Sequence, residues 1–250
     1  MRKRVEEWWS PQLRRRMPVA VYGHFGVPIL LFPTAMADFL EYERFRVIEV
    51  LRPWIEQGVC KLYTINSINA DSWLHPTLPP RERILRHMAY NRYVVQEVVP
   101  FIVADCRGPQ PIITAGASLG AFHAANLFFQ RPDIFAGTIA LSGVYDLQVY
   151  SNGYFDDDCY FNSPIHFLPN LNDNHWLPLL RQRRHIYLAC GRGTYERPEA
   201  TLQLSAILSA KGIRHTVEVW GPEWPHDWQT WRAMMPRYVE RLRLDPPYPA

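Results

Sequence analysis

The chain has 250 residues, of which 48% are hydrophobic and 20% are charged, and its formal net charge at pH 7 is only +3. This composition excludes an intrinsically disordered chain, because disordered chains combine low hydrophobicity with high net charge. An α/β protein of this length often folds around one large core, so we expect a single domain over residues 1–250.

Segments with the apolar pattern of β-strands alternate along the chain with segments that have helical periodicity. In chain order we predict strand Val19–His24, strand Pro28–Thr34, helix Leu40–Gln57, strand Lys61–Ile68, helix Arg81–Val99, strand Pro111–Ala115, helix Leu119–Gln130, strand Gly137–Ser142, strand His185–Cys190, helix Pro198–Lys211, strand Thr216–Trp220 and helix Thr230–Leu242. Such alternation is typical of a mostly parallel sheet that is covered by helices on both faces. The fold class that we expect is therefore α/β.

Two connections between these elements are informative. The first two strands are joined by the short turn Phe25–Gly26–Val27, which favours an antiparallel hairpin at the start of the sheet. Residues 144–184 are rich in Tyr, Phe, Asn, Asp and Pro and show no clear periodicity. We interpret them as a loop-rich excursion over the sheet edge that helps to shape a substrate pocket.

Several kinds of partner are not expected. Short basic clusters such as Arg14–Arg16 occur without a nucleic-acid recognition motif, so we interpret them as solvated surface. The cysteines are widely separated, with no CxxC pair, and no HExxH pattern occurs, so we expect no metal site. No apolar run approaches the roughly 18 residues of a membrane span, and residues 1–20 are charged. We expect a soluble cytoplasmic protein, unless an export signal has been removed.

The strongest local motif is Gly116–Ala117–Ser118–Leu119–Gly120, a GxSxG sequence between a predicted strand and a predicted helix. A sharp turn in this context exposes the serine hydroxyl and holds the serine backbone under strain. The amino end of the following helix favours negative charge that develops there. We therefore predict that Ser118 is a nucleophile.

A serine hydroxyl needs a general base at neutral pH, and hydrolases with this motif place the residues in the order serine, acid, histidine. His226 is the last of nine histidines and lies between the final predicted strand and the final predicted helix. This position predicts that His226 is the general base.

The acid that orients the histidine should follow a strand next to the nucleophile. Glu196 follows the strand His185–Cys190 after one short loop, so it is our preferred candidate. Asp146, just past the strand Gly137–Ser142, remains the alternative. Asp227 is the direct neighbour of the base in sequence and is expected to point elsewhere.

Acyl transfer also needs backbone amides that stabilise an oxyanion. Leu119 is expected to supply one amide, and Ala35 or Met36 in the loop 33–37 the other. Aromatic residues cluster in sequence around these loops, and we expect Trp73, Tyr145 and Trp228 either to contact an acyl or aryl ester or to pack in the core.

The GxSxG segment, the Gly191–Glu196 loop and His226–Asp227–Trp228 together resemble an esterase family that includes esterase D-like enzymes, feruloyl and acetyl xylan esterases and the mycolyltransferases. The resemblance runs from about Trp8 to Leu242. It implies an α/β-hydrolase fold, a serine hydrolase activity and no metal or organic cofactor. The acid of mycolyltransferase-like members is a glutamate, which favours Glu196.

The function that we expect is hydrolysis of a small-molecule carboxylic ester through an acyl-enzyme. An acyltransferase would use the same three residues with an alcohol in place of water. A catalytically silent α/β-hydrolase scaffold that binds a ligand or a protein is the alternative from another class of function.

Overall fold

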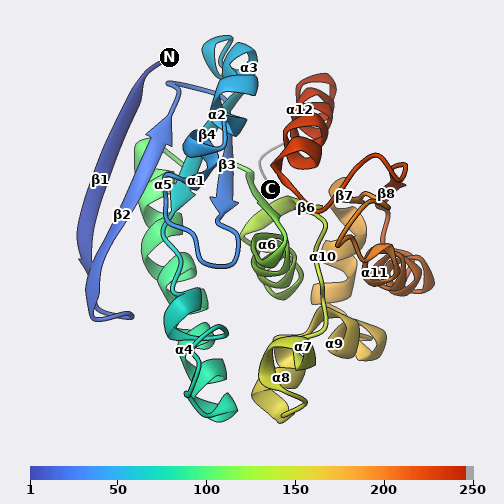
Figure 1. Cartoon of the computed structure of the whole chain (residues 1–250). Helices are drawn as coiled ribbons and strands as arrows, with labels where there is room; N and C mark the ends of the chain where they lie inside the picture. The colour runs from blue at the N-terminus through green and yellow to red at the C-terminus, as the bar shows by residue number, and fades with distance from the viewer. Residues whose placement is uncertain (246–250) are drawn as a thin grey trace.

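The computed structural model describes residues 1–245, in which an eight-stranded sheet separates two layers of helices (Figure 1). The strands lie in the order β1-β2-β4-β3-β5-β6-β7-β8. Their bounds are β1 Lys3–Ser10, β2 Arg15–Tyr22, β3 Val27–Phe32, β4 Cys60–Ile65, β5 Ile112–Ala117, β6 Phe135–Leu141, β7 His185–Cys190 and β8 Thr216–Val219. From β4 to β8 all neighbouring strands pair in parallel, and β2 pairs antiparallel with both β1 and β4. The expected α/β fold class is confirmed.

The central strands are apolar because both of their faces are covered. Every residue of β4, β5, β6 and β7 is buried, as the continuous apolar runs in the sequence predict. Alternate residues of one strand enter different layers of the core: Leu30 and Phe32 of β3 belong to one cluster, and Ile29 and Leu31 to the other. This double burial fixes the register of β3 at the centre of the sheet.

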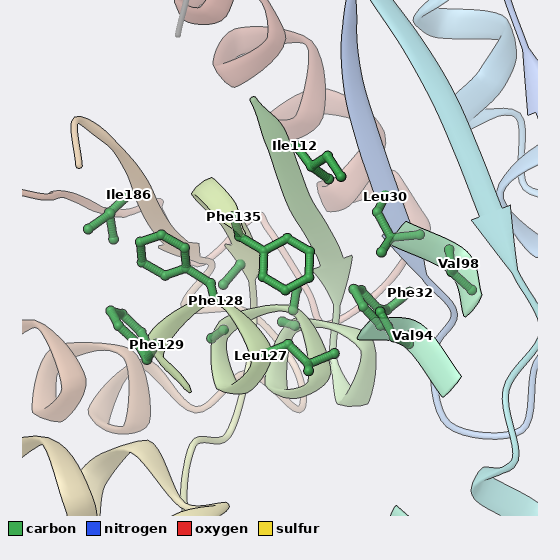
Figure 2. Close-up of a cluster of buried hydrophobic side chains, with 14 of the residues drawn as sticks. Leu30, Phe32, Val94, Val98, Ile112, Leu127, Phe128, Phe129, Phe135 and Ile186 are labelled. Atoms are coloured by element: carbon green, nitrogen blue, oxygen red, sulfur yellow. The ribbon is translucent and has the colours of Figure 1, made fainter. Parts of the chain in front are cut away.

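The helices divide between the two faces. They are α1 Glu41–Arg44, α2 Val47–Val50, α3 Arg52–Glu56, α4 Pro80–Tyr93, α5 Val99–Asp105, α6 Leu119–Gln130, α7 Gln148–Ser151, α8 Asp157–Phe161, α9 Pro164–Asn170, α10 Trp176–Gln182, α11 Pro198–Ala210 and α12 Trp228–Leu244. One core cluster lies between the sheet and the helices α4, α5, α6, α9, α10 and α11. Figure 2 shows part of this cluster, with β3, β5 and β6 facing α6 and the π-helical turn Val94–Val98. The other cluster packs α1 to α3 and α12 on the opposite face.

Several predicted elements differ from the structure. The strand β1 was not predicted, because its sequence KRVEEWWS carries four charged residues on a largely exposed strand. The expected hairpin of the next two strands is wrong: β4 lies between β2 and β3, and β2 instead forms a hairpin with β1. The short turn does not make β3 the partner of β2, because β3 pairs in parallel with β4 on one edge and with β5 on the other.

The expected helix Leu40–Gln57 is divided into α1, α2 and α3, and the expected helix Arg81–Val99 continues through a π-helical turn into α5. Arg46 adopts a left-handed backbone between α1 and α2, with φ 64°, which ends the first helix. Residues 144–184 are not mainly loop, because they contain the four short helices α7 to α10. No helix within residues 1–245 has the length and apolar character needed to cross a membrane.

Candidate active site

Ser118 lies at a sharp turn between β5 and α6. Its backbone has φ 55° and ψ −124°, a conformation that L-residues rarely adopt. The two glycines around it permit this geometry. A Cβ atom on Gly116 would lie 2.3 Å from the carbonyl oxygen of Gly120, and one on Gly120 would lie 2.3 Å from that of Phe32. The GxSxG glycines are therefore required by close backbone approach, as in a nucleophile elbow.

His226 and Glu196 come to Ser118 from two loops at the carboxyl edge of the sheet. The Nε2 atom of His226 lies 2.9 Å from Oγ of Ser118, and its Nδ1 atom lies 3.3 Å from Oε2 of Glu196. Backbone hydrogen bonds tie the two loops together, because the amide of His226 donates to the carbonyl of Thr194 at 2.9 Å. The structure thus brings together the three residues that the sequence predicts, from positions up to 108 residues apart.

The Glu196 side chain is almost fully buried and accepts three hydrogen bonds. Oε1 accepts from the hydroxyl of Ser142 at 2.6 Å and from the amide of Gly191 at 3.1 Å, while Oε2 faces His226. Burial raises the pKa of Glu196, but the hydrogen bonds from His226, Ser142 and Gly191 outweigh it and hold the pKa below its ordinary value. The group is therefore a carboxylate at neutral pH.

Ser142 is a residue of this site that the sequence analysis missed. Its hydroxyl donates to Glu196 and accepts a hydrogen bond from Nε1 of Trp231 at 3.0 Å. It lies directly after β6, beside the strands that carry Ser118 and Glu196, and its φ is 54°. That position at the carboxyl edge is the only signal that the sequence contains, and a serine after a strand is too common to be diagnostic.

The other nearby acids have different roles. Asp146 accepts a hydrogen bond from the amide of Gln148 at 2.9 Å and lies 4.0 Å from His166, so its partners are in the α7 region. Asp227 accepts from the amide of Trp228 at 2.6 Å and caps α12. The geometry therefore favours Glu196 over Asp146 as the partner of His226. Within residues 1–245, no group of three or more His, Cys, Asp or Glu side chains could hold a metal ion.

Backbone amides without acceptors lie where an oxyanion site is expected. Within the part of the chain that the structure describes, the amides of Leu119, Ala35 and Met36 donate no hydrogen bond. Leu119 is only 2% exposed, and an unpaired amide in a buried residue is uncommon in folded proteins. The beginning of the Ala35 loop contacts the elbow, because the carbonyls of Phe32 and Pro33 lie against Gly120. These amides are therefore free to donate to a negatively charged oxygen near Ser118.

The three aromatic residues that we expected to contact substrate or pack in the core are core residues. Trp73 and Tyr145 are 2% and 1% exposed, and Trp228 is 8% exposed and stacks on Phe45 at 4.6 Å. Their position in sequence near the site loops did not reveal that their rings face inward. The large side chains that are exposed on these loops are Met36 and Tyr195.

A buried polar network lies beneath the site. Nε2 of His123, on α6, is 2.8 Å from Oδ1 of Asn69, and the amide group of Asn69 donates to the carbonyl of Thr34 at 3.3 Å. His87, on α4, accepts from Nε1 of Trp73 at 3.2 Å. Burial lowers the pKa of His123 to about 3, and burial, with a smaller contribution from the neighbouring imidazole of His123, lowers the pKa of His87 well below its ordinary value. Both histidines are neutral in the folded protein.

We therefore expect the protein to lose stability as the pH falls below about 6.5. Below this pH the unfolded chain binds protons at His87 and His123 that the folded chain does not bind, and each histidine lowers the free energy of unfolding by about 1.4 kcal/mol per pH unit. Urea unfolding between pH 7.5 and 5 measures how the free energy of unfolding changes with pH, and His123→Gln should make this change smaller. A free energy of unfolding that is constant over this pH range would contradict the conclusion that both histidines are neutral in the folded protein.

A cavity of about 1060 Å³ lies at the opposite edge of the sheet and contains none of the residues above. It is lined by the ends of α5 and α12, with cations that include Lys61, Arg107 and Arg243. Cations at the carboxyl ends of helices complement the negative end of the helix dipole. We interpret these side chains as structural for this reason.

A mostly parallel sheet with a nucleophile elbow after a central strand defines the class of the molecule, which is an α/β-hydrolase fold. The sequence matches the family profile described as "Putative esterase" over residues 79–242, and the chain belongs to this family. The resemblance that the sequence analysis identified is thereby confirmed.

Solved structures share the fold along almost the whole chain. A ferulic acid esterase superposes with a TM-score of 0.73 at 16% identity, over 96% of this chain and 98% of that chain. An S-formylglutathione hydrolase from Agrobacterium tumefaciens gives a TM-score of 0.71 at 14% identity, over 96% and 95%. The corresponding enzyme from Staphylococcus aureus gives 0.65 at 18% identity, over 97% and 96%. No curated protein matches the sequence.

Proposed function

We propose that this member of the esterase family hydrolyses a small-molecule carboxylic ester through an acyl-enzyme on Ser118, with His226 as general base and Glu196 as the acid that orients it. The observation that carries the proposal is the continuous contact from Oγ of Ser118 to Nε2 of His226 at 2.9 Å and from Nδ1 of His226 to Glu196 at 3.3 Å. Such a chain of contacts activates a serine hydroxyl that is otherwise a poor nucleophile.

In the first step, Ser118 attacks the ester carbonyl carbon while its proton moves to Nε2 of His226. Glu196 holds the proton on Nδ1 and stabilises the imidazolium that forms. The tetrahedral intermediate then collapses, and His226 donates the proton to the leaving alcohol. In the second step, water attacks the acyl-enzyme carbonyl and loses a proton to His226, and His226 then donates that proton to Oγ of Ser118 as the bond to the acyl group breaks and the carboxylic acid leaves.

The amides of Leu119 and of Ala35 or Met36 are proposed to stabilise the oxyanion of each tetrahedral intermediate. Fixed donors of this kind are worth about 10²- to 10³-fold in rate each. Their lack of any acceptor within residues 1–245 supports this role.

The proposal is tested by labelling the protein with a fluorophosphonate probe, followed by digestion and mass spectrometry. We expect one phosphonyl group per chain, on the peptide that contains Ser118, and a loss of nitrophenyl ester hydrolysis in proportion to labelling. Heat-denatured protein is the control and should not react. Hydrolysis that survives complete labelling, or labelling of another residue, would contradict the proposal.

The same labelling and hydrolysis assays distinguish an ester hydrolase from the two alternative functions. An acyltransferase would label equally but would form a new ester when an alcohol acceptor is added, which product analysis detects. A binding scaffold would neither react with the fluorophosphonate nor hydrolyse the nitrophenyl ester.

A further inference from the structure

Glu41 is a buried carboxylate with an unusual set of partners. The residue is 4% exposed and is the first residue of α1. Its Oε2 atom accepts from the backbone amide of Thr34 at 2.8 Å, and its Oε1 atom accepts from the Thr34 hydroxyl at 2.5 Å. Burial holds the pKa of Glu41 above its ordinary value, although the Thr34 hydrogen bonds and the charge of Arg44 act in the opposite direction. Within residues 1–245 Glu41 forms no ion pair, because Arg44 pairs with Asp38 instead.

A buried carboxylate without a paired cation costs stability unless its hydrogen bonds compensate. Both hydrogen bonds of Glu41 go to one residue, Thr34, which directly precedes Ala35 and Met36. The carboxylate therefore holds the loop whose free amides are the proposed oxyanion donors. Nothing else in its contacts explains why an acid is buried there.

The rest of the loop is also held in place. The hydroxyl of Tyr42, the neighbour of Glu41, donates to the carbonyl of Phe32 at 2.8 Å, and this carbonyl lies against Gly120 of the elbow. On the far side, Asn69 donates to the carbonyl of Thr34 and the hydroxyl of Ser67 to the carbonyl of Ala37, at 3.3 and 2.7 Å. The loop between β3 and α1 is thus held by α1 and by the segment after β4, and its beginning lies against Gly120, two residues after Ser118.

We propose that Glu41 is a positioning residue for ester hydrolysis, which fixes the loop 33–37 through Thr34 so that the amide of Ala35 or Met36 points at the oxyanion beside Ser118. The inference rests on the proposed function. Peptide groups are planar, so Glu41 fixes the peptide plane before Thr34, and the Asn69 hydrogen bond to the Thr34 carbonyl fixes the next plane, which contains the amide of Ala35. A donor that is displaced by about 1 Å can cost about 100-fold in rate.

The test replaces Glu41 by glutamine, which keeps the size of the side chain but cannot accept both Thr34 hydrogen bonds. We expect kcat for a nitrophenyl ester to fall about 10- to 100-fold while KM changes less than about threefold, because the oxyanion exists only after attack. The matched control is Glu43→Gln, an exposed carboxylate two residues on that contacts Lys3 and Tyr22 and should leave kcat unchanged.

A second measurement separates positioning from a loss of fold. A trifluoromethyl ketone, which forms a tetrahedral adduct on a serine, should bind Glu41→Gln at least tenfold more weakly, while circular dichroism and the melting temperature stay close to those of the wild type. If Glu41→Gln does not fold, Thr34→Val carries the test, since it removes only the hydroxyl donor, and Thr34→Ser should restore kcat.

The outcomes for this inference and for the proposed function are distinct. Wild-type protein that hydrolyses esters, together with a folded Glu41→Gln of unchanged kcat and unchanged affinity for the ketone, would overturn the positioning role alone. Wild-type protein that neither labels with fluorophosphonate nor hydrolyses any ester would overturn the proposed function and this inference with it.

Discussion

Replacement of Ser118 by alanine is expected to lower kcat for nitrophenyl ester hydrolysis by about 10⁵-fold or more, because no covalent acyl-enzyme can form. The residue is in hydrogen-bond contact with His226, and the variant leaves that imidazole without its proton donor. Residual hydrolysis would come only from substrate binding and the free amides. Steady-state absorbance measurements on wild type and variant determine the ratio.

The fold of Ser118→Ala should be retained. The substitution removes one oxygen and keeps a Cβ atom in the left-handed conformation with φ 55°, so backbone strain is similar. The melting temperature is expected to change by a few degrees at most. Ser209→Ala, at an exposed position of α11, is the matched control and should hydrolyse esters at the wild-type rate. If Ser118→Ala keeps more than about one hundredth of the wild-type kcat, Ser118 is not the nucleophile.

The parts of the fold that the sequence predicts well have strong local signals. The helix Leu119–Gln130 and the strand His185–Cys190 begin and end at the predicted residues. Each is mostly apolar and almost entirely buried, so local pattern and tertiary burial agree. The charged strand β1 has no such pattern, and its existence depends on pairing with β2. Strand order is likewise a non-local property, which is why β4 could not be placed between β2 and β3 in advance.

The candidate site likewise contains residues that the sequence predicts and residues that it does not. Ser118 and His226 were predicted because a motif and a fixed chain order point to them, and Glu196 because it follows the correct strand. Ser142 and Glu41 could not be predicted, since each acts through a hydrogen bond to a group in another segment, and their neighbours in sequence do not indicate that partner. The aromatic residues could have faced either way, and the structure places them in the core because adjacent helices pack there.

Glu196→Gln is expected to lower kcat/KM by about 10³- to 10⁴-fold, and the reason lies in the donors around the carboxylate. The Ser142 hydroxyl and the Gly191 amide both donate to Oε1, so a glutamine would keep its oxygen there and turn its NH₂ group toward Nδ1 of His226. A donor facing Nδ1 forces the imidazole proton onto Nε2. That tautomer cannot accept the proton of Ser118, even though all of the atoms remain in place.

Asp146→Asn is the matched control, because it also neutralises a carboxylate near the carboxyl edge of the sheet. The asparagine oxygen can still accept from the amide of Gln148, so kcat/KM should stay within about twofold of the wild type. Parallel measurement of the two variants decides which acid serves His226. A large loss of kcat/KM in Asp146→Asn, together with a nearly normal kcat/KM in Glu196→Gln, would contradict the assignment of Glu196. It would mean that the loop after β7 moves during the reaction and that the acid comes from the segment after β6. The backbone hydrogen bond from His226 to Thr194 opposes such a movement, since it ties the base to the same loop that carries Glu196.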